Sequence, residues 1–140
     1  TLWEESTRVP LIVVAPGLTT PGSTSAEAVS LLDVYPTLVD IAGLPTPAHL
    51  DGESLKPLLQ DPGATRDRPA VSVRGFGNYA VRDESYRYIR YADGSEELYD
   101  HRNDPGEWTN LAGEARFGAV KERLAGFLPV DAAPSYTAGE

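Results

Sequence analysis

The first side chains to consider as carriers of chemistry are the two histidines. His49 and His101 do not stand at a metal-ligand spacing from each other, and the chain has no cysteine that could complete such a site. His49 lies in a proline-flanked loop, where we expect a surface position. His101 stands beside Asp100 and near Asp104, so we expect it to hydrogen-bond locally at a turn. Without cysteine there is also no thiol nucleophile and no disulfide.

An acidic run is the second candidate. Its six carboxylates are Asp93, Glu96, Glu97, Asp100, Asp104 and Glu107. A calcium loop needs carboxylates at fixed offsets around a glycine at the sharp turn, and this spacing does not match that template. The sequence also has no glycine-rich phosphate loop, no G-x-S-x-G element and no H-E-x-x-H element. We therefore interpret the run as a solvated turn region.

Arg8 is the cation with the clearest functional interpretation. It precedes the apolar run Leu11–Ala15, and active sites in open α/β sheets assemble at the ends of strands. Arg8 could there pair with a carboxylate or an oxyanion, but a surface ion pair with Glu4 or Glu5 is the more common arrangement. Trp3 and Glu5 carry the same two interpretations. Trp3, Glu5 and Arg8 are our candidates for the periphery of an active site, and the residues alone form no catalytic constellation.

Composition limits the class of protein and its partners. The 140 residues carry 21 Asp and Glu against 12 Lys and Arg, a formal charge of −9, so phosphate-rich partners would be repelled overall. We therefore predict no nucleic-acid partner. We also predict no membrane partner, since no apolar stretch approaches the ~18 residues of a spanning helix. The length and a hydrophobic content of 41% are typical of a globular domain.

Residues 1–66 are the first of two predicted regions and are typical of part of an α/β layer. The run Leu11–Ala15 does not alternate with polar residues, which indicates a strand buried on both faces of a sheet. Such a strand needs neighbours, and no second run of this kind follows in the chain. We therefore expect the rest of the sheet to lie upstream of Thr1.

A helix is predicted over residues 33–43. As its N-cap, Asp33 would accept from the free N–H groups of the first turn. Pro36 would be the third helical residue, where its missing N–H costs no intrahelical bond. Gly43 is the expected stop, and a second, short helix is expected within residues 50–59.

Residues 67–128 indicate a small antiparallel sheet followed by a helix. Strands are expected at 70–74, 79–83, 86–92 and 97–100. The third strand would place tyrosines on a packed face and arginines on the other. One apolar stripe of the helix over 114–128 would lie across the sheet, formed by Phe117, Val120, Leu124 and Phe127. Residues 129–140 are predicted to be a flexible tail.

Four longer segments carry a family signal when they are taken together. They are TLWEESTRVPLIVVAPG at 1–17, SLLDVYPTLVDIAGLP at 30–45, LDGESLKPLL at 50–59 and ELYDHRNDPGEWTNLA at 97–112. In this order they resemble the C-terminal portion of type I sulfatases, in particular the branch of iduronate-2-sulfatase-like enzymes. The four segments span nearly the whole chain.

The resemblance implies an alkaline-phosphatase-like architecture, in which a large mixed sheet carries the active site and a smaller antiparallel sheet packs against it. On that basis the fold class is an α/β fragment, the edge of the large sheet in residues 1–66, followed by an α+β subdomain in 67–128 packed by a C-terminal helix. The family hydrolyses sulfate esters. It uses a formylglycine, made from Cys or Ser in a C/S-x-P-x-R motif, and a Ca²⁺ ion held by Asp and Asn or Gln side chains. A periplasmic or extracellular location would follow from the family.

The departures from the family pattern decide what can be carried over. The chain has no cysteine and no S-x-P-x-R. The family's metal-binding Asp residues, its Gly-Glu-His-Gly element and its catalytic Lys would lie upstream of Thr1. We therefore expect no catalytic residue and no metal ligand in this chain, and we expect its partner to be the upstream catalytic portion of the same protein, with a sulfate ester as substrate.

Two alternatives stay open. The chain could be an autonomous, non-catalytic interaction module built on its small sheet. Its parent could also be a phosphonate or phosphate ester hydrolase of the same superfamily, in which Thr or Ser replaces the formylglycine precursor. The residues of this chain do not separate these classes.

Overall fold

The computed structural model describes residues 1–131, so most of the predicted tail lies outside the described residues. The chain divides into two compact units. Unit 1 combines residues 1–9 with the described residues from Pro69 onward, and unit 2 is Pro10–Arg68. The division between these units falls between Arg68 and Pro69, and the domain boundary at residue 66 stays a prediction. Residues 1–9, however, belong to the sheet-containing unit and not to the first region, because they are bonded to the sheet as described below.

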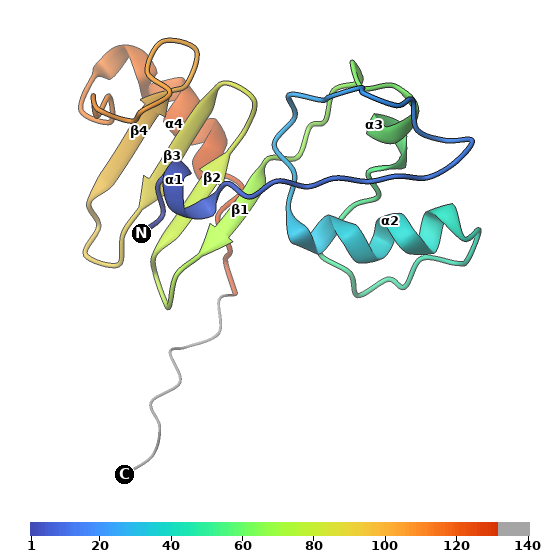
Figure 1. Ribbon diagram of the computed structural model, residues 1–140. Helices are drawn as coiled ribbons and strands as arrows, with labels where there is room; N and C mark the ends of the chain where they lie inside the picture. Colours follow the sequence, from blue (N-terminus) through green and yellow to red (C-terminus); the bar gives the residue numbers. More distant parts are fainter. Residues whose placement is uncertain (132–140) are drawn as a thin grey trace. The chain divides into compact units, whose positions relative to one another are not determined.

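Unit 1 is built on a four-stranded antiparallel sheet in the order β1-β2-β3-β4 (Figure 1). The strands are β1 (Ala70–Val73), β2 (Tyr79–Arg82), β3 (Tyr86–Arg90) and β4 (Glu96–Asp100). Asp83 closes the turn between β2 and β3 by accepting from the backbone N–H groups of Ser85 and Tyr86. Gly94 has a φ of 85° in the turn between β3 and β4, a conformation that favours glycine. The four predicted strands are therefore confirmed, with ends that differ by one or two residues.

The C-terminal helical segment covers one face of this sheet. It consists of a 3₁₀ turn, η2 (Ala115–Phe117), and α4 (Gly118–Ala125). Its side chains pack on strand residues of the same face, in a core of Tyr79, Val81, Tyr88, Leu98, Leu124 and Leu128. The predicted stripe was wrong at its last member. Helical spacing stops at Ala125, so Phe127 is 37% exposed and Leu128 takes the core position.

The N-terminal segment lies on the opposite face of the sheet. Leu2 is buried there with Ala80, Ile89 and Tyr99, and α1 (Glu4–Thr7) follows it (Figure 1). This covering brings residues 1–9 into unit 1.

Arg87 lies on this covered face, whereas Arg90 shares the opposite face with Tyr86 and Tyr88, since side chains alternate along a strand. The predicted separation of tyrosines and arginines on β3 was therefore wrong.

Unit 2 contains η1 (Leu31–Asp33), α2 (Val34–Ile41) and α3 (Lys56–Gln60). The predicted helix exists, with Pro36 as its third residue and Gly43 beyond its end at a φ of 67°. The predicted capping role of Asp33 was wrong. Its buried carboxylate accepts instead from the N–H groups of Ser30 and Glu53 and from Arg66. This carboxylate joins three segments of unit 2, because a desolvated charge needs several donors.

The predicted strand Leu11–Ala15 is not formed in the described part of the chain. Residues 10–14 make no backbone–backbone hydrogen bond with residues 1–131, and Ile12 and Val14 are 85% and 81% exposed. A strand exists only through a partner that takes its N–H and C=O groups. The described residues of unit 2 supply no such partner strand.

In the part of the chain that the structure describes, no helix has the length and apolar character needed to cross a bilayer.

Leu124 tests the core of unit 1. Its side chain is fully buried, so Leu124→Ala should lower the free energy of unfolding by about 2–5 kcal/mol, through lost contacts and a cavity. Phe127→Ala, at the partly exposed position of the same segment, should cost less than half as much. Urea unfolding followed by circular dichroism measures both, and equal losses would contradict the packing described above.

Candidate functional site

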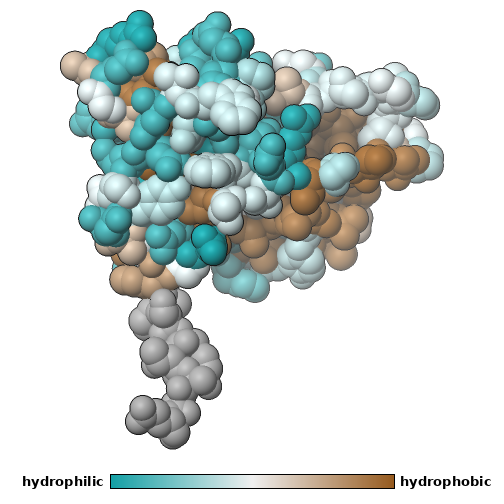
Figure 2. Space-filling view, turned by 60° about the vertical axis from the view of Figure 1, so that its left-hand side comes forward, coloured by the Kyte–Doolittle hydropathy of each residue, from teal (hydrophilic) through white to brown (hydrophobic). Residues whose placement is uncertain are grey.

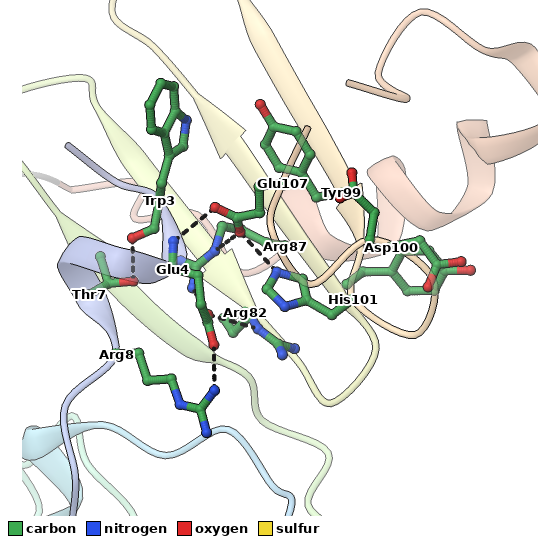
Figure 3. A network of polar contacts seen from close by, with 12 residues as sticks. Trp3, Glu4, Thr7, Arg8, Arg82, Arg87, Tyr99, Asp100, His101 and Glu107 are labelled. Atoms are coloured by element: carbon green, nitrogen blue, oxygen red, sulfur yellow. Dashed lines mark hydrogen bonds and ion pairs between the residues drawn. The ribbon is translucent and has the colours of Figure 1, made fainter. Parts of the chain in front are cut away.

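Arg87 is the centre of the most extensive polar network in unit 1. It lies on β3, on the face covered by the N-terminal segment, and its side chain is only 3% exposed. Its Nε donates to Glu107 Oε1 at 2.6 Å and its Nη1 donates to the backbone carbonyl of Leu2 at 3.1 Å. Its Nη2 donates to Glu4 (Figure 3). The buried guanidinium is thus surrounded by three acceptors from two separate segments, the N-terminal segment and the loop after β4, as a desolvated charge requires.

Glu107 is the second member of the network and lies in the loop after β4. Its carboxylate binds Arg87 through Oε1 and accepts from the backbone N–H of Glu4 through Oε2 at 2.8 Å. Nε2 of His101 lies 2.8 Å from Oε1 (Figure 3). The carboxylate is buried, with 4% of its side chain exposed. The solvated-turn interpretation of the acidic run was therefore wrong at Glu107 and at Asp100, which is also buried.

Glu4 is the most heavily paired carboxylate in this network. Besides Arg87, it contacts Arg82 at 3.4 Å and Arg8 at 3.7 Å. Burial raises the pKa of Glu4, but the hydrogen bond and charge of Arg87 and the charge of Arg82 outweigh this effect and hold the pKa below its usual value. Glu4 is therefore ionised wherever unit 1 is folded at neutral pH.

The predicted site residues lie near this network without forming its centre. Arg8 makes the expected ion pair with Glu4, and 78% of its side chain is exposed. Trp3 is half-exposed and its Nε1 donates to Glu97 at 2.7 Å. Glu5 is exposed and has no hydrogen bond or ion pair within residues 1–131. Their place at the periphery of an active site stays a prediction.

The two histidines lie in different surroundings, and the pair Arg87–Glu107 was not predicted from the sequence. His49 is exposed, as expected. His101 was expected to hydrogen-bond locally at a turn, and its ring pairs with Glu107, six residues further along the same loop. Arg87 and Glu107 were not recognised as partners. Their spacing of 20 residues matches no local motif. The one sequence signal that could have indicated an ordered loop here is D-P-G-E at residues 104–107.

The cluster does not fit a calcium ion. One ligand atom each from Glu4, His101 and Glu107 lies within 4.8 Å of the others. Calcium, however, takes six to eight oxygen ligands, and this group offers a nitrogen and two carboxylates that already neutralise Arg87 and Arg82. Two arginines at this position would repel a cation. The network therefore has the properties of a structural ion cluster.

Unit 2 carries a second candidate, an apolar surface that we call the apolar face. A broad hydrophobic region is visible at the right of Figure 2. The exposed apolar side chains of unit 2 include Ile12, Val14, Leu31, Leu32, Tyr35 and Leu38. They come from the unpaired segment 10–14, from η1 and from α2. Exposed apolar groups gathered in this way mark interaction surfaces.

The pKa of Glu4 predicts a pH effect on stability. Because the folded-state pKa is lowered, the contribution of Glu4 is complete above the unfolded value of about 4.3 and is lost as the pH falls below it. The free energy of unfolding of Glu4→Gln should therefore decline less between pH 5 and 3 than that of the wild type. Urea titrations at several pH values measure this slope. Glu5→Gln, at the exposed neighbouring carboxylate, should keep the wild-type slope, and a shared change in both variants would refute the assignment.

Residues 1–130 match the family N-sulphoglucosamine sulphohydrolase, C-terminal. A sulfatase from Formosa agariphila is 38% identical over 142 residues, which cover 97% of this chain and 28% of the relative. Arylsulfatase K from Homo sapiens is 35% identical over 127 residues, which cover 79% and 23%. The chain thus spans less than a third of these relatives.

Solved structures agree with this match. BT1596, a 2-O GAG sulfatase, is 31% identical with a TM-score of 0.55, over 67% of this chain and 22% of that one. The phosphonate monoester hydrolase of Agrobacterium radiobacter is 32% identical with a TM-score of 0.51, over 67% and 23%. The similarity therefore covers two chemically related classes of ester hydrolase.

Proposed function

Because this chain belongs to the N-sulphoglucosamine sulphohydrolase C-terminal family, we propose that it acts as the C-terminal portion of a sulfuric ester hydrolase, where it completes the fold and does not supply the reactive groups. The observation that carries this proposal is the unpaired apolar segment 10–14, together with the exposed apolar side chains of η1 and α2. A catalytic portion with a sheet edge would satisfy the backbone groups of this segment.

The reactive groups would then come from the catalytic portion of the protein. Residues 1–140 lack the precursor motif of the formylglycine that the resemblance implies. For the implied Ca²⁺ ion, the described residues 1–131 offer only the arginine-paired cluster, which does not fit it. Formylglycine would supply the nucleophile and Ca²⁺ would polarise the sulfate. The residues of this chain would shape and support that site from outside.

The substrate class follows from the relatives only as a proposal. BT1596 is a 2-O GAG sulfatase, and arylsulfatase K is among the relatives, so sulfated sugars and aryl sulfates are the esters to test first. The iduronate-2-sulfatase-like branch remains a prediction within this group. The phosphonate monoester hydrolase of similar fold makes phosphonate monoesters the second candidate.

The activity prediction separates these classes. The full-length protein should hydrolyse an aryl sulfate or a sulfated monosaccharide faster than the matching phosphate or phosphonate monoester, and residues 1–140 alone should hydrolyse none of them. Released sulfate and phosphate are measured by ion chromatography. Faster phosphonate hydrolysis would move the protein to the second class, and turnover by residues 1–140 alone would disprove the division of labour.

The apolar face predicts the behaviour of the separate chain. Residues 1–140 alone should bind a hydrophobic dye or self-associate, because Ile12 and Leu38 face water. The double variant Ile12→Asp, Leu38→Asp should reduce both effects, measured by dye fluorescence and light scattering. Val130→Asp changes an exposed apolar residue of unit 1 and should leave both unchanged. A dye-silent, monomeric wild type would favour the autonomous interaction module.

A further inference from the structure

We propose that the buried cluster around Arg87 is a latch that positions the N-terminal segment on the small sheet, and that Arg87 and Glu107 are positioning residues of the complete enzyme. The Arg87 latch comprises the side chains of Glu4, Arg87, His101 and Glu107 with the backbone carbonyl of Leu2. The structural part of this proposal stands on unit 1 alone. The kinetic part rests on the proposed function.

The latch joins segments that are far apart in the sequence. Arg87 bonds to Leu2 and Glu4, which lie 85 and 83 residues away in the sequence. Glu107 bonds to the backbone N–H of Glu4 across 103 residues. Each of these bonds satisfies a buried donor or acceptor that would otherwise have no partner. The contacts are therefore expected to form cooperatively.

The backbone of Glu107 adopts a conformation that is unusual for a non-glycine residue. Its φ of 57° lies in the left-handed region, and among the described residues it is the only non-glycine with a positive φ. An L-residue avoids this conformation unless its surroundings hold it there. Here the carboxylate is held by Arg87, His101 and the N–H of Glu4. A glycine would fit the backbone better but would lack the carboxylate, so the side chain is the reason for this residue type.

The N-terminal segment has few other features that would hold it on the sheet. The helix α1 has four residues, no side-chain cap at its start and no buried residue. A helix this short does not hold itself in water. Leu2 is the one residue of segment 1–9 in the apolar core of the sheet. The latch adds three hydrogen bonds to this segment, whereas its other polar side-chain contacts with the sheet are Trp3 with Glu97 and Glu4 with Arg82.

The consequence concerns the chain that follows. Val9 leads directly to residues 10–14, the unpaired segment that the proposed function pairs with the catalytic portion. A latched α1 fixes the point on the sheet from which this segment leaves. Loosening the latch would leave the reactive groups unchanged but would let their supporting segment start from many positions, which lowers the fraction of correctly arranged sites.

Hydrogen exchange on the full-length protein tests the structural part. In Arg87→Met and Glu107→Gln, the amide of Glu4 and those of Ser6, Thr7 and Arg8 should exchange at least ~10-fold faster, while β3 and β4 keep their protection. Arg90→Met alters another arginine of β3 and should leave these amides unchanged. Unchanged exchange at Glu4 in both latch variants would overturn the proposal. If the amides of β3 also exchange faster in Arg87→Met, the exchange of the Glu4 amide in Glu107→Gln decides on the latch.

Kinetics on the same proteins test the positioning role. For the ester that the wild type hydrolyses, Arg87→Met should lower kcat about 10-fold or more with KM changed less than about 3-fold, since the proposal gives the latch residues a positioning role and no contact with substrate. Arg87→Lys keeps the positive charge but loses the planar guanidinium with its several N–H donors. Its kcat should therefore lie between those of Arg87→Met and the wild type. Normal kcat with a released segment would refute the positioning role. If the wild type hydrolyses no ester, the proposed function fails while the exchange result still decides on the latch.

Discussion

The structure of unit 1 depends on the neutralisation of one buried guanidinium. Arg87 lies on the sheet face opposite α4, where water cannot solvate its charge. A lone charge in such a place would cost several kcal/mol, so acceptors must come from elsewhere in the chain. They come from the loop after β4 and from the N-terminal segment. This single requirement explains why residues 1–9 share a unit with a sheet that begins at Ala70.

Unit 2 follows the same rule with the opposite charge. The buried carboxylate of Asp33 joins Ser30, Glu53 and Arg66, and these bonds outweigh the effect of burial and lower its pKa. Here, however, polar satisfaction is combined with an apolar face that the unit leaves open. The interior of unit 2 is thus ordered by its own bonds, whereas its surface is suited to a further layer of protein. This contrast favours the proposed role of the chain as a part that completes a larger fold.

The sequence predicted the local elements well because they rest on local rules. The strands of unit 1 follow from turn residues such as Gly94, and the helix α2 follows from the spacing between Pro36 and Gly43. The strand 11–15 failed for a different reason. Its apolar composition indicates burial in a sheet, but pairing requires a partner strand that composition cannot provide. The stripe of α4 failed only where the helix ends and its periodicity no longer applies.

The sequence by itself determined the family, the small antiparallel sheet and the absence of a nucleophile motif in these residues, since each is written in residue types at short spacing. Only the tertiary structure decided that Glu4, Arg87 and Glu107 meet, and that the acidic run turns inward at Glu107. The physical reason is that charge pairing acts through space. Burial of one arginine selects partners by proximity in the fold, and a spacing of 83 or 20 residues carries no sign of that choice.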